Sequence, residues 1–332
     1  CLVTAAAFAA TTISASACTT IYVGGDLVEE GTPFVARTED YGSDYNKLWF
    51  ISESGKWKQG DHYVGCPEYG PFEWDFTHDS YRFTYFTNDI YYDGTCPECG
   101  KKADHYSYTE FGTNEKGVSV SATETLYGNE KVTEADPYRD AEWAAANGNA
   151  RIGIEETDIP TIILAEASSA REGVKLLLDI YENYGCVYAS GVFICDKDEV
   201  WYVENCSGTQ YVAIKLNNNM IFLEPNMAVI GRVDLDDENV IASKDLIAVA
   251  KKAGTFVGDE AKNIIDFRAS YARISEKMDQ RMIDGLNYLN ATYKYDSDAL
   301  VADNTKFTIS NLDASDKLVA LYTNIKADRK LD

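Results

Sequence analysis

Residues 15–25 read Ala-Ser-Ala-Cys-Thr-Thr-Ile-Tyr-Val-Gly-Gly and combine a processing signal with the start of a fold. The run from Thr19 to Val23 ends at two glycines, which predicts a strand followed by a turn. Ala15-Ser16-Ala17 is the small-x-small pattern that a signal peptidase accepts, so we expect cleavage before Cys18. The first strand would then start directly after the first residue of the mature chain.

The segment before this cut has the composition of an export signal. Residues 2–17 carry no charge and are too short to span a bilayer comfortably. The sequence starts with Cys1 and lacks the basic residues that open such a signal, so we expect a few residues to precede it. No later stretch is apolar enough for a membrane span. The sequence predicts a signal segment at 1–17 and a secreted protein with no membrane partner after processing.

Cys18 has three interpretations at this position. The first is a lipoprotein, in which the thiol is acylated and anchors the chain, although Ala15 is a poor fit to that processing signal. The second is a structural cysteine that lies near the cut by chance. The third is an N-terminal nucleophile whose own α-amine acts as the base, because the amine titrates near 7.7–8.0 and a free thiol near 8.5.

Composition narrows the classes of protein that the chain can belong to. Its 332 residues, 45 % of them hydrophobic, suffice for a large core, and 7 prolines exclude a collagen-like chain. Thirty basic residues against 54 acidic ones give a net charge of −24, which repels phosphate backbones and excludes a nucleic-acid partner. The 3 histidines fit no Cys/His/Asn pattern, so the composition allows a histidine-free mechanism.

Periodicity and turn signals predict strands and helices that alternate in blocks. The predicted strands are 19–23, 33–37, 48–51, 117–123, 191–195, 199–204, 211–214 and 220–223. The predicted helices are 139–147, a helix from 158, 171–181 with a serine cap and a stop at Gly185, 239–253, 260–271, 276–289 and 312–323. This order indicates an α+β layered protein.

The chain reads as one domain after the signal segment. It has no internal repeat and no linker rich in Pro, Gly or Ser, so residues 18–332 are interpreted as a single catalytic domain. Residues 52–110 are Tyr-rich, contain Cys66, Cys96 and Cys99, and are interpreted as an insertion. The chain stops at Asp332 without a polar tail, which suggests truncation at the C-terminus.

Several segments, in their order along the chain, resemble the corresponding segments of one known family. They are Cys18-Thr-Thr-Ile-Tyr-Val-Gly24, Ala36-Arg-Thr-Glu-Asp40, Thr113-Asn-Glu-Lys-Gly-Val-Ser-Val-Ser-Ala-Thr-Glu-Thr125, Ala170-Arg-Glu-Gly-Val174, Trp201-Tyr-Val-Glu204, Tyr211-Val-Ala-Ile214 and Pro225-Asn226. The chain thus resembles secreted dipeptidases of the dipeptidase D type, from Cys18 to about Leu289. These are related to penicillin V acylases and bile-salt hydrolases among the N-terminal-nucleophile hydrolases. The region 52–110 departs from the family, and its usual C-terminal extension is absent.

The resemblance implies a four-layer αββα sandwich, in which two stacked antiparallel sheets lie between helices. It places Cys18 as the nucleophile at the start of the first strand, facing Arg37 and Asp40. Arg37 would hold the thiolate by its charge, and Asp40 would bind the new α-ammonium. The alternative for this pair is a surface ion pair of little energetic weight.

Three further positions match or depart from the family's pattern. Asn226 matches its oxyanion amide, with a turn residue as the alternative. Glu124, beside Thr123, stands where the related acylases have an asparagine, so both are interpreted as substrate-binding, with Glu124 for a substrate ammonium. Arg281 matches a late arginine of the family, with a solvated helix charge as the alternative.

The other cysteines leave their pairing open. Cys96-Pro-Glu-Cys99 is half of a zinc ribbon without a second CxxC pair, and a structural zinc needs four ligands. Cys66 and a histidine could complete it, but an exported protein favours a disulfide among Cys66, Cys96 and Cys99. Cys186, Cys195 and Cys206 fit either buried thiols or one disulfide. The prediction includes no metal and no cofactor.

The function predicted on these grounds is a secreted cysteine dipeptidase that hydrolyses amide bonds of small peptides. One alternative is an N-acyl amide hydrolase of the penicillin V acylase or bile-salt hydrolase type. The alternative outside enzymes is a lipid-anchored binding lipoprotein acylated at Cys18. Many relatives in the resembled family form oligomers, so a homo-oligomer is a possible state of this chain. No stretch of the sequence indicates an interface.

Overall fold

The fold is given by a computed structural model of the chain. It describes residues 18–38, 47–65, 71–88, 109–124, 126–148, 150–273, 280–281, 284–285 and 318–320. At residues 88, 123–124 and 318–320 this description covers the backbone only. The three cysteines of the predicted insertion lie outside the described residues, as does Asp40.

Two antiparallel sheets form the centre of the molecule. The large sheet has eight strands in the order β14 (Val240–Ala242), β11 (Tyr211–Lys215), β10 (Val200–Asn205), β9 (Ser190–Cys195), β8 (Ser119–Glu124), β7 (Phe111–Asn114), β6 (Phe83–Asn88) and β3 (Lys47–Ser52). The small sheet has three strands in the order β12 (Ile221–Glu224), β1 (Thr19–Val23) and β2 (Phe34–Thr38). All neighbouring strands in both sheets are antiparallel.

Two minor sheets and the helices surround this centre. One minor sheet joins β15 (Gly258–Asp259), β16 (Ile264–Asp266), β13 (Ile230–Asp234) and β17 (Leu318–Ala320), and the other joins β4 (His62–Val64) and β5 (Glu73–Asp75). The α-helices are α1 (Glu130–Ala135), α2 (Ala141–Ala146), α3 (Ile159–Glu166), α4 (Ala170–Asn183), α5 (Leu246–Ala253) and α6 (Phe267–Tyr271). Short 3₁₀ turns are η1 (Gly25–Leu27) and η3 (Glu260–Lys262).

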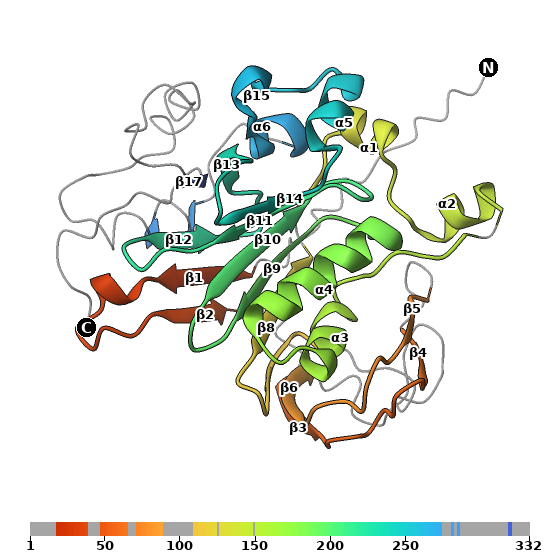
Figure 1. The fold of residues 1–332 in the computed structure, drawn as a ribbon, viewed down its shortest axis with the longest axis vertical. Helices are drawn as coiled ribbons and strands as arrows, with labels where there is room; N and C mark the ends of the chain where they lie inside the picture. The colour runs from red at the N-terminus through yellow and green to blue at the C-terminus, as the bar shows by residue number, and fades with distance from the viewer. Residues whose placement is uncertain are drawn as a thin grey trace, which may run out of the picture.

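The strands β9, β10 and β11 of the large sheet are buried on both faces. One face packs on the small sheet, where Phe222 of β12 lies 4.7 Å from Tyr202 of β10 between ring centroids. The other face carries Trp201 and packs against α3 and α4, and Figure 1 shows α4 lying across its strands. Because neither face meets water, β9 and β10 read as nearly continuous apolar runs.

The layers agree with the predicted α+β class of two stacked antiparallel sheets flanked by helices. On the outer face of the small sheet, a Cβ added at Gly285 would meet the Leu223 side chain of β12. Gly285 is helical, as are residues 280, 281 and 284, so part of the helix predicted at 276–289 covers this sheet. Helical segments therefore lie outside both sheets.

Local signals predicted the first strands and the long helix correctly. The predicted strand Thr19–Val23 is β1. Ser169 caps α4 by accepting a hydrogen bond from the backbone N–H of Glu172. Gly185 follows α4 with a φ of 78°, a left-handed conformation that ends helices and that glycine adopts at little cost.

Three predicted helices are wrong in part. The segment 239–253 begins with β14 and becomes helical only at α5. In the segment 260–271, residues 260–262 form the 3₁₀ turn η3, β16 occupies residues 264–266, and the α-helix is limited to α6. Residues 318–320, predicted as helical, form β17 and pair with β13. Short apolar runs do not distinguish helix from strand, and pairing with a distant strand decided these cases.

The predicted insertion contributes to the main sheet. Strand β6 lies within residues 52–110, pairs with β3 along its whole length and pairs with β7 from Phe83 to Phe86. Strands β4 and β5 form a separate two-stranded sheet in the same region. Across the described ranges, we find no helix with the length and apolarity that crossing a membrane requires.

Candidate active site

Strand register places Cys18 in the space between the two sheets. Thr20 of β1 pairs with Arg37 of β2 on one side and with Glu224 of β12 on the other. Paired residues point to the same face of a sheet, and residues two apart along a strand do so as well. Thr20, Glu224 and Cys18 are all largely buried, with Cys18 8 % exposed.

The Arg37 guanidinium contacts the thiol of Cys18. Its Nη2 donates to Cys18 Sγ at 3.3 Å. Its Nη1 donates to the carbonyl oxygen of Ala122 at 2.6 Å and to Ser121 Oγ at 3.3 Å, both on β8. The large sheet therefore holds the positive charge in place beside the sulfur, where it favours the thiolate over the neutral thiol.

Arg281 reaches the same place from a segment more than 260 residues away in sequence. Its Nη1 donates to the carbonyl oxygen of Cys18 at 2.6 Å and to Thr19 Oγ1 at 3.0 Å. It also donates to Asn226 Oδ1 at 2.9 Å, while Nη2 donates to the carbonyl oxygen of Pro225 at 2.8 Å. One side chain thus ties the start of β1 to the end of β12.

Asn226 lies in the turn that follows β12 and has a φ of 60°. Asparagine tolerates this left-handed conformation better than most residues do. Because Oδ1 accepts from Arg281, the donor end of the amide is Nδ2. The structure therefore brings four of the predicted site residues together: Cys18, Arg37, Asn226 and Arg281.

The structure describes the other three predicted site residues only in part or not at all. The backbones of Thr123 and Glu124 pair with Gly191 and Ser190 at the end of β8, directly after the carbonyl of Ala122 that accepts from Arg37. The side chains of Thr123 and Glu124, like all of Asp40, lie outside the described residues. Their roles remain predictions.

A comparison with known protein families shows to which family the chain belongs. The profile of peptidase family C69 matches residues 17–298. This chain belongs to peptidase family C69. The match covers most of the chain and begins at the residue before Cys18.

Two curated relatives of this C69 chain are the following bacterial proteins. It is 32 % identical over 304 residues to "Probable dipeptidase B" of Streptococcus pyogenes serotype M6, covering 90 % of this chain and 55 % of that protein. It is 32 % identical over 262 residues to "Probable dipeptidase" of Salmonella dublin, covering 77 % and 53 %. The chain therefore spans about half the length of the curated relatives that it matches.

Solved structures show a more distant likeness. Penicillin V acylase from Agrobacterium tumefaciens superposes with a TM-score of 0.37 at 15 % identity, covering 63 % of this chain and 49 % of that one. A mutant of the conjugated bile acid hydrolase from Clostridium perfringens gives a TM-score of 0.30 at 13 % identity, covering 73 % and 59 %.

The site of this C69 chain contains an acidic residue that the sequence did not single out. Glu156 Oε1 lies 3.8 Å from Arg37 Nη2, and the two side chains are 8 % and 7 % exposed. Glu156 belongs to the buried run Glu155–Asp158, which leads into α3. Burial raises the pKa of Asp158 to about 7, and its Oδ1 accepts from the Tyr63 hydroxyl at 2.6 Å. The sequence signal that could have indicated this run is the four consecutive acidic or hydroxyl residues Glu155–Asp158, which lie shortly before Pro160.

The Asn-Glu-Lys-Gly motif of the resemblance has a structural role. Asn114 Oδ1 accepts from the backbone N–H groups of Lys116 and Val118 and so closes the turn between β7 and β8. Its Nδ2 donates to the carbonyl oxygens of Leu164 and Ala167 at the end of α3. The motif therefore fixes the helix against the strand that holds Arg37.

Three other cysteines are free thiols, which is one of the two predicted alternatives. Cys186 and Cys206 are buried, and Cys195 is half-buried. Burial raises the pKa of Cys195 to about 11 and raises the pKa of Cys186 and Cys206 as well, so these thiols stay protonated at neutral pH. No group of metal-ligating side chains occurs in the part of the chain that the structure describes.

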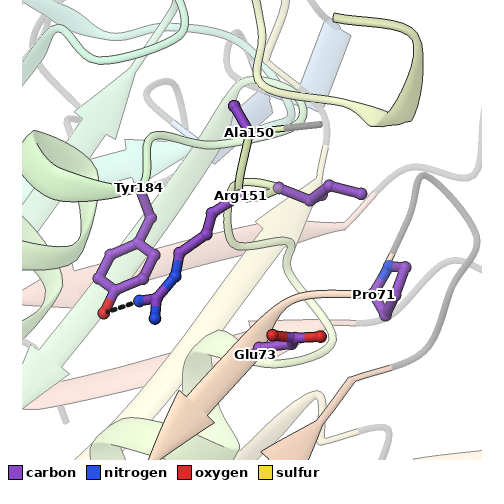
Figure 2. Close-up of a pocket in the computed structure, with 6 residues that line it drawn as sticks. Pro71, Glu73, Ala150, Arg151 and Tyr184 are labelled. Carbon is purple, nitrogen blue, oxygen red and sulfur yellow. Dashed lines mark hydrogen bonds between the residues drawn. The ribbon is translucent and has the colours of Figure 1, made fainter. Parts of the chain in front are cut away.

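Two cavities differ in their relation to this site. A cavity of about 460 Å³ lies between the sheets and is lined by Arg37, Val35, Phe111 and Phe193. A smaller one of about 190 Å³ is shown in Figure 2, where Arg151 donates to the Tyr184 hydroxyl at 2.8 Å. Its lining includes none of Cys18, Arg37, Asn226 and Arg281, whereas the first cavity is lined by Arg37, so the first cavity is the one that adjoins the candidate active site.

Proposed function

We propose that this chain is the catalytic part of a secreted cysteine dipeptidase with Cys18 as its N-terminal nucleophile. The contact between the Arg37 guanidinium and Cys18 Sγ at 3.3 Å carries the proposal. Membership of family C69 and relatives named dipeptidases support the reaction class. The thiols of Cys186, Cys195 and Cys206 have raised pKa values, which leaves Cys18 as the nucleophile among the described cysteines.

The proposed reaction follows from these contacts. Once the bond after Ala17 is cut, the α-amine of Cys18 takes the thiol proton and the thiolate attacks the substrate carbonyl. Asn226 Nδ2 donates to the oxyanion, and Asp40 is proposed to bind the ammonium. The ammonium then protonates the leaving amine, and water hydrolyses the thioester. Arg281 holds the Cys18 carbonyl, so the amine and thiol of this residue stay oriented.

Exposure of the Cys18 amine is part of the proposal. The uncharged segment 2–17 and the small residues before Cys18 support removal by a signal peptidase during secretion. We expect mass spectrometry of the secreted protein to show a mature N-terminus that starts at an unmodified Cys18. A mass increased by acyl chains, or residues 1–17 still attached, would contradict a free-amine catalyst.

The choice between a dipeptidase and an N-acyl amide hydrolase rests on the substrate amine. A dipeptidase that binds the substrate ammonium should hydrolyse free dipeptides at least about 100-fold faster than their N-acetyl derivatives, because a buried carboxylate left without its cation is costly. The measurement is kcat/KM for matched free and acetylated dipeptides. Faster hydrolysis of the acetylated series would instead support the acylase alternative.

Two carboxylates are candidates for the ammonium site. Glu124 ends β8, next to Thr123, and Glu156 is separated from the Cys18 sulfur by one guanidinium. The ammonium of a dipeptide is two bonds from the attacked carbonyl carbon, so its partner must lie close to the sulfur. We expect Glu124→Gln or Glu156→Gln to raise KM for free dipeptides and to reduce the preference over acetylated ones. An unchanged preference in both variants would exclude these residues.

A further inference from the structure

A carboxyl group from the large sheet crosses the core and binds the turn that carries Asn226. Glu204 of β10 is fully buried and lies on the face that packs against the small sheet. Its Oε1 accepts from the backbone N–H of Val229 at 2.6 Å, and its Oε2 accepts from that of Ile230 at 3.1 Å. The Tyr202 hydroxyl also donates to Oε1, at 3.0 Å.

The turn between β12 and β13 is thus held from two sides. Arg281 binds its first part, through the carbonyl oxygen of Pro225 and the side chain of Asn226. Glu204 binds the end of the turn, through the backbone N–H groups of Val229 and of Ile230, the first residue of β13. Asn226, which the first anchor binds, has a φ of 60°, a left-handed conformation that the contacts on both sides of the turn help to maintain.

A carboxyl group is a costly choice at this position. Burial and the neighbouring Glu224 carboxylate raise the pKa of Glu204 to about 8, whereas the bonds from Val229, Ile230 and Tyr202 lower it. An apolar side chain would avoid this cost but would leave two buried N–H groups without these acceptors. The two buried N–H groups of Val229 and Ile230 therefore explain why a carboxyl group lies in the core here.

We propose that Glu204 is a positioning residue, which holds the turn 225–229 so that the amide of Asn226 is aimed at the oxyanion. The inference rests on the proposed function, since it concerns the same site. Oxyanion donors act only when they are preorganised, and a displacement of about 1 Å in a catalytic group can cost about 100-fold in rate. Glu204 itself touches neither the thiol nor the substrate in this proposal.

The test compares Glu204→Gln with a matched substitution elsewhere. Glutamine keeps the shape of glutamate but presents an NH₂ group where one acceptor oxygen stood, so one of the turn's N–H groups loses its partner. We expect kcat for a free dipeptide to fall about 10- to 100-fold, with KM changed less than about threefold. The rate at which iodoacetamide alkylates Cys18 should stay at the wild-type value, because this reaction uses no oxyanion donor.

Glu166→Gln is the control. Glu166 is also a buried glutamate, and it accepts from the backbone N–H of Thr77 at 2.8 Å and from the Thr77 hydroxyl. It lies at the end of α3 and is not part of the proposed catalytic machinery. We expect this variant to lower Tm while keeping kcat. An equal loss of kcat in both variants would show a general effect of core damage and would overturn the inference.

A double-mutant cycle with Asn226→Gly tests whether Glu204 acts through the amide. If it does, Glu204→Gln should reduce kcat little further in the Asn226→Gly background, and additive losses would overturn the inference. If Glu204→Gln does not fold, Glu204→Asp, which retracts the carboxyl group by one methylene, takes its place in the same measurements. Wild-type turnover of free dipeptides is measured first. Its absence would reject the proposed function, whereas normal turnover by Glu204→Gln would reject only the role of Glu204.

Discussion

Replacing Cys18 with alanine should reduce dipeptide hydrolysis by about 10⁴-fold or more while leaving the fold intact. The substitution removes the only atom that forms the proposed thioester, and loss of a nucleophile costs enzymes this much or more in kcat. Cys18 is 8 % exposed and small, so the loss of its sulfur should lower the free energy of unfolding by only about 1 kcal/mol. The measurements are kcat for a free dipeptide and Tm for the processed protein.

Cys195→Ala is the matched control for this experiment. Cys195 lines the cavity that also includes Arg37, but its pKa is raised to about 11 by burial and the neighbouring Asp196. It is therefore a neutral thiol at pH 7, and its replacement should leave kcat close to the wild-type value. Turnover retained by Cys18→Ala, or lost in Cys195→Ala, would reject the assignment of the nucleophile.

Replacing Asn226 with glycine should lower kcat about 10²- to 10³-fold, the usual cost of removing one oxyanion donor. Glycine is the informative replacement because it adopts the φ of 60° found at this position without strain, so the variant removes the amide and keeps the backbone. KM should change little if the amide acts mainly on the transition state. The measurement is kcat and KM for a free dipeptide, with Tm as a check on the fold.

Asn263→Gly provides the corresponding control. Asn263 also has a positive φ, 53°, and it follows η3 in the minor sheet region, where its side chain donates to Asp236 Oδ1. Its replacement makes the same change to the backbone away from the proposed site, and kcat should stay at the wild-type level. If Asn226→Gly kept full turnover, the oxyanion would have to be bound by other donors.

The early strands and α4 could be predicted because their signals are local. Thr19–Val23 is β1 as predicted, and α4 has the serine cap and the glycine stop that the sequence indicated. The segments 239–253 and 260–271 were predicted as helices throughout, yet they contain β14 and β16. These strands are three residues long and exist because they pair with β11 and β13, which their own sequence does not show.

The candidate site, like the fold, could be predicted from the sequence only in part. The resemblance led to Cys18, Arg37, Asn226 and Arg281, and the structure brings these four side chains together. Glu204 and Glu156 were not singled out, because a glutamate within a strand or before a helix is most often a solvated charge. Only their burial and their contacts with the turn after β12 and with Arg37 show otherwise.

The amino-acid sequence alone determined the cysteine that precedes the first strand, the net negative charge, the first strand and α4, because these depend on residue type and on near neighbours in the chain. Only the tertiary structure decided which charges meet that cysteine. Arg37, Asn226 and Arg281 come from β2, the turn after β12 and a helical segment near the end of the C69 match, and strand register and sheet packing bring them within hydrogen-bond distance. Such contacts depend on the summed packing of the whole core, which no local stretch of sequence encodes.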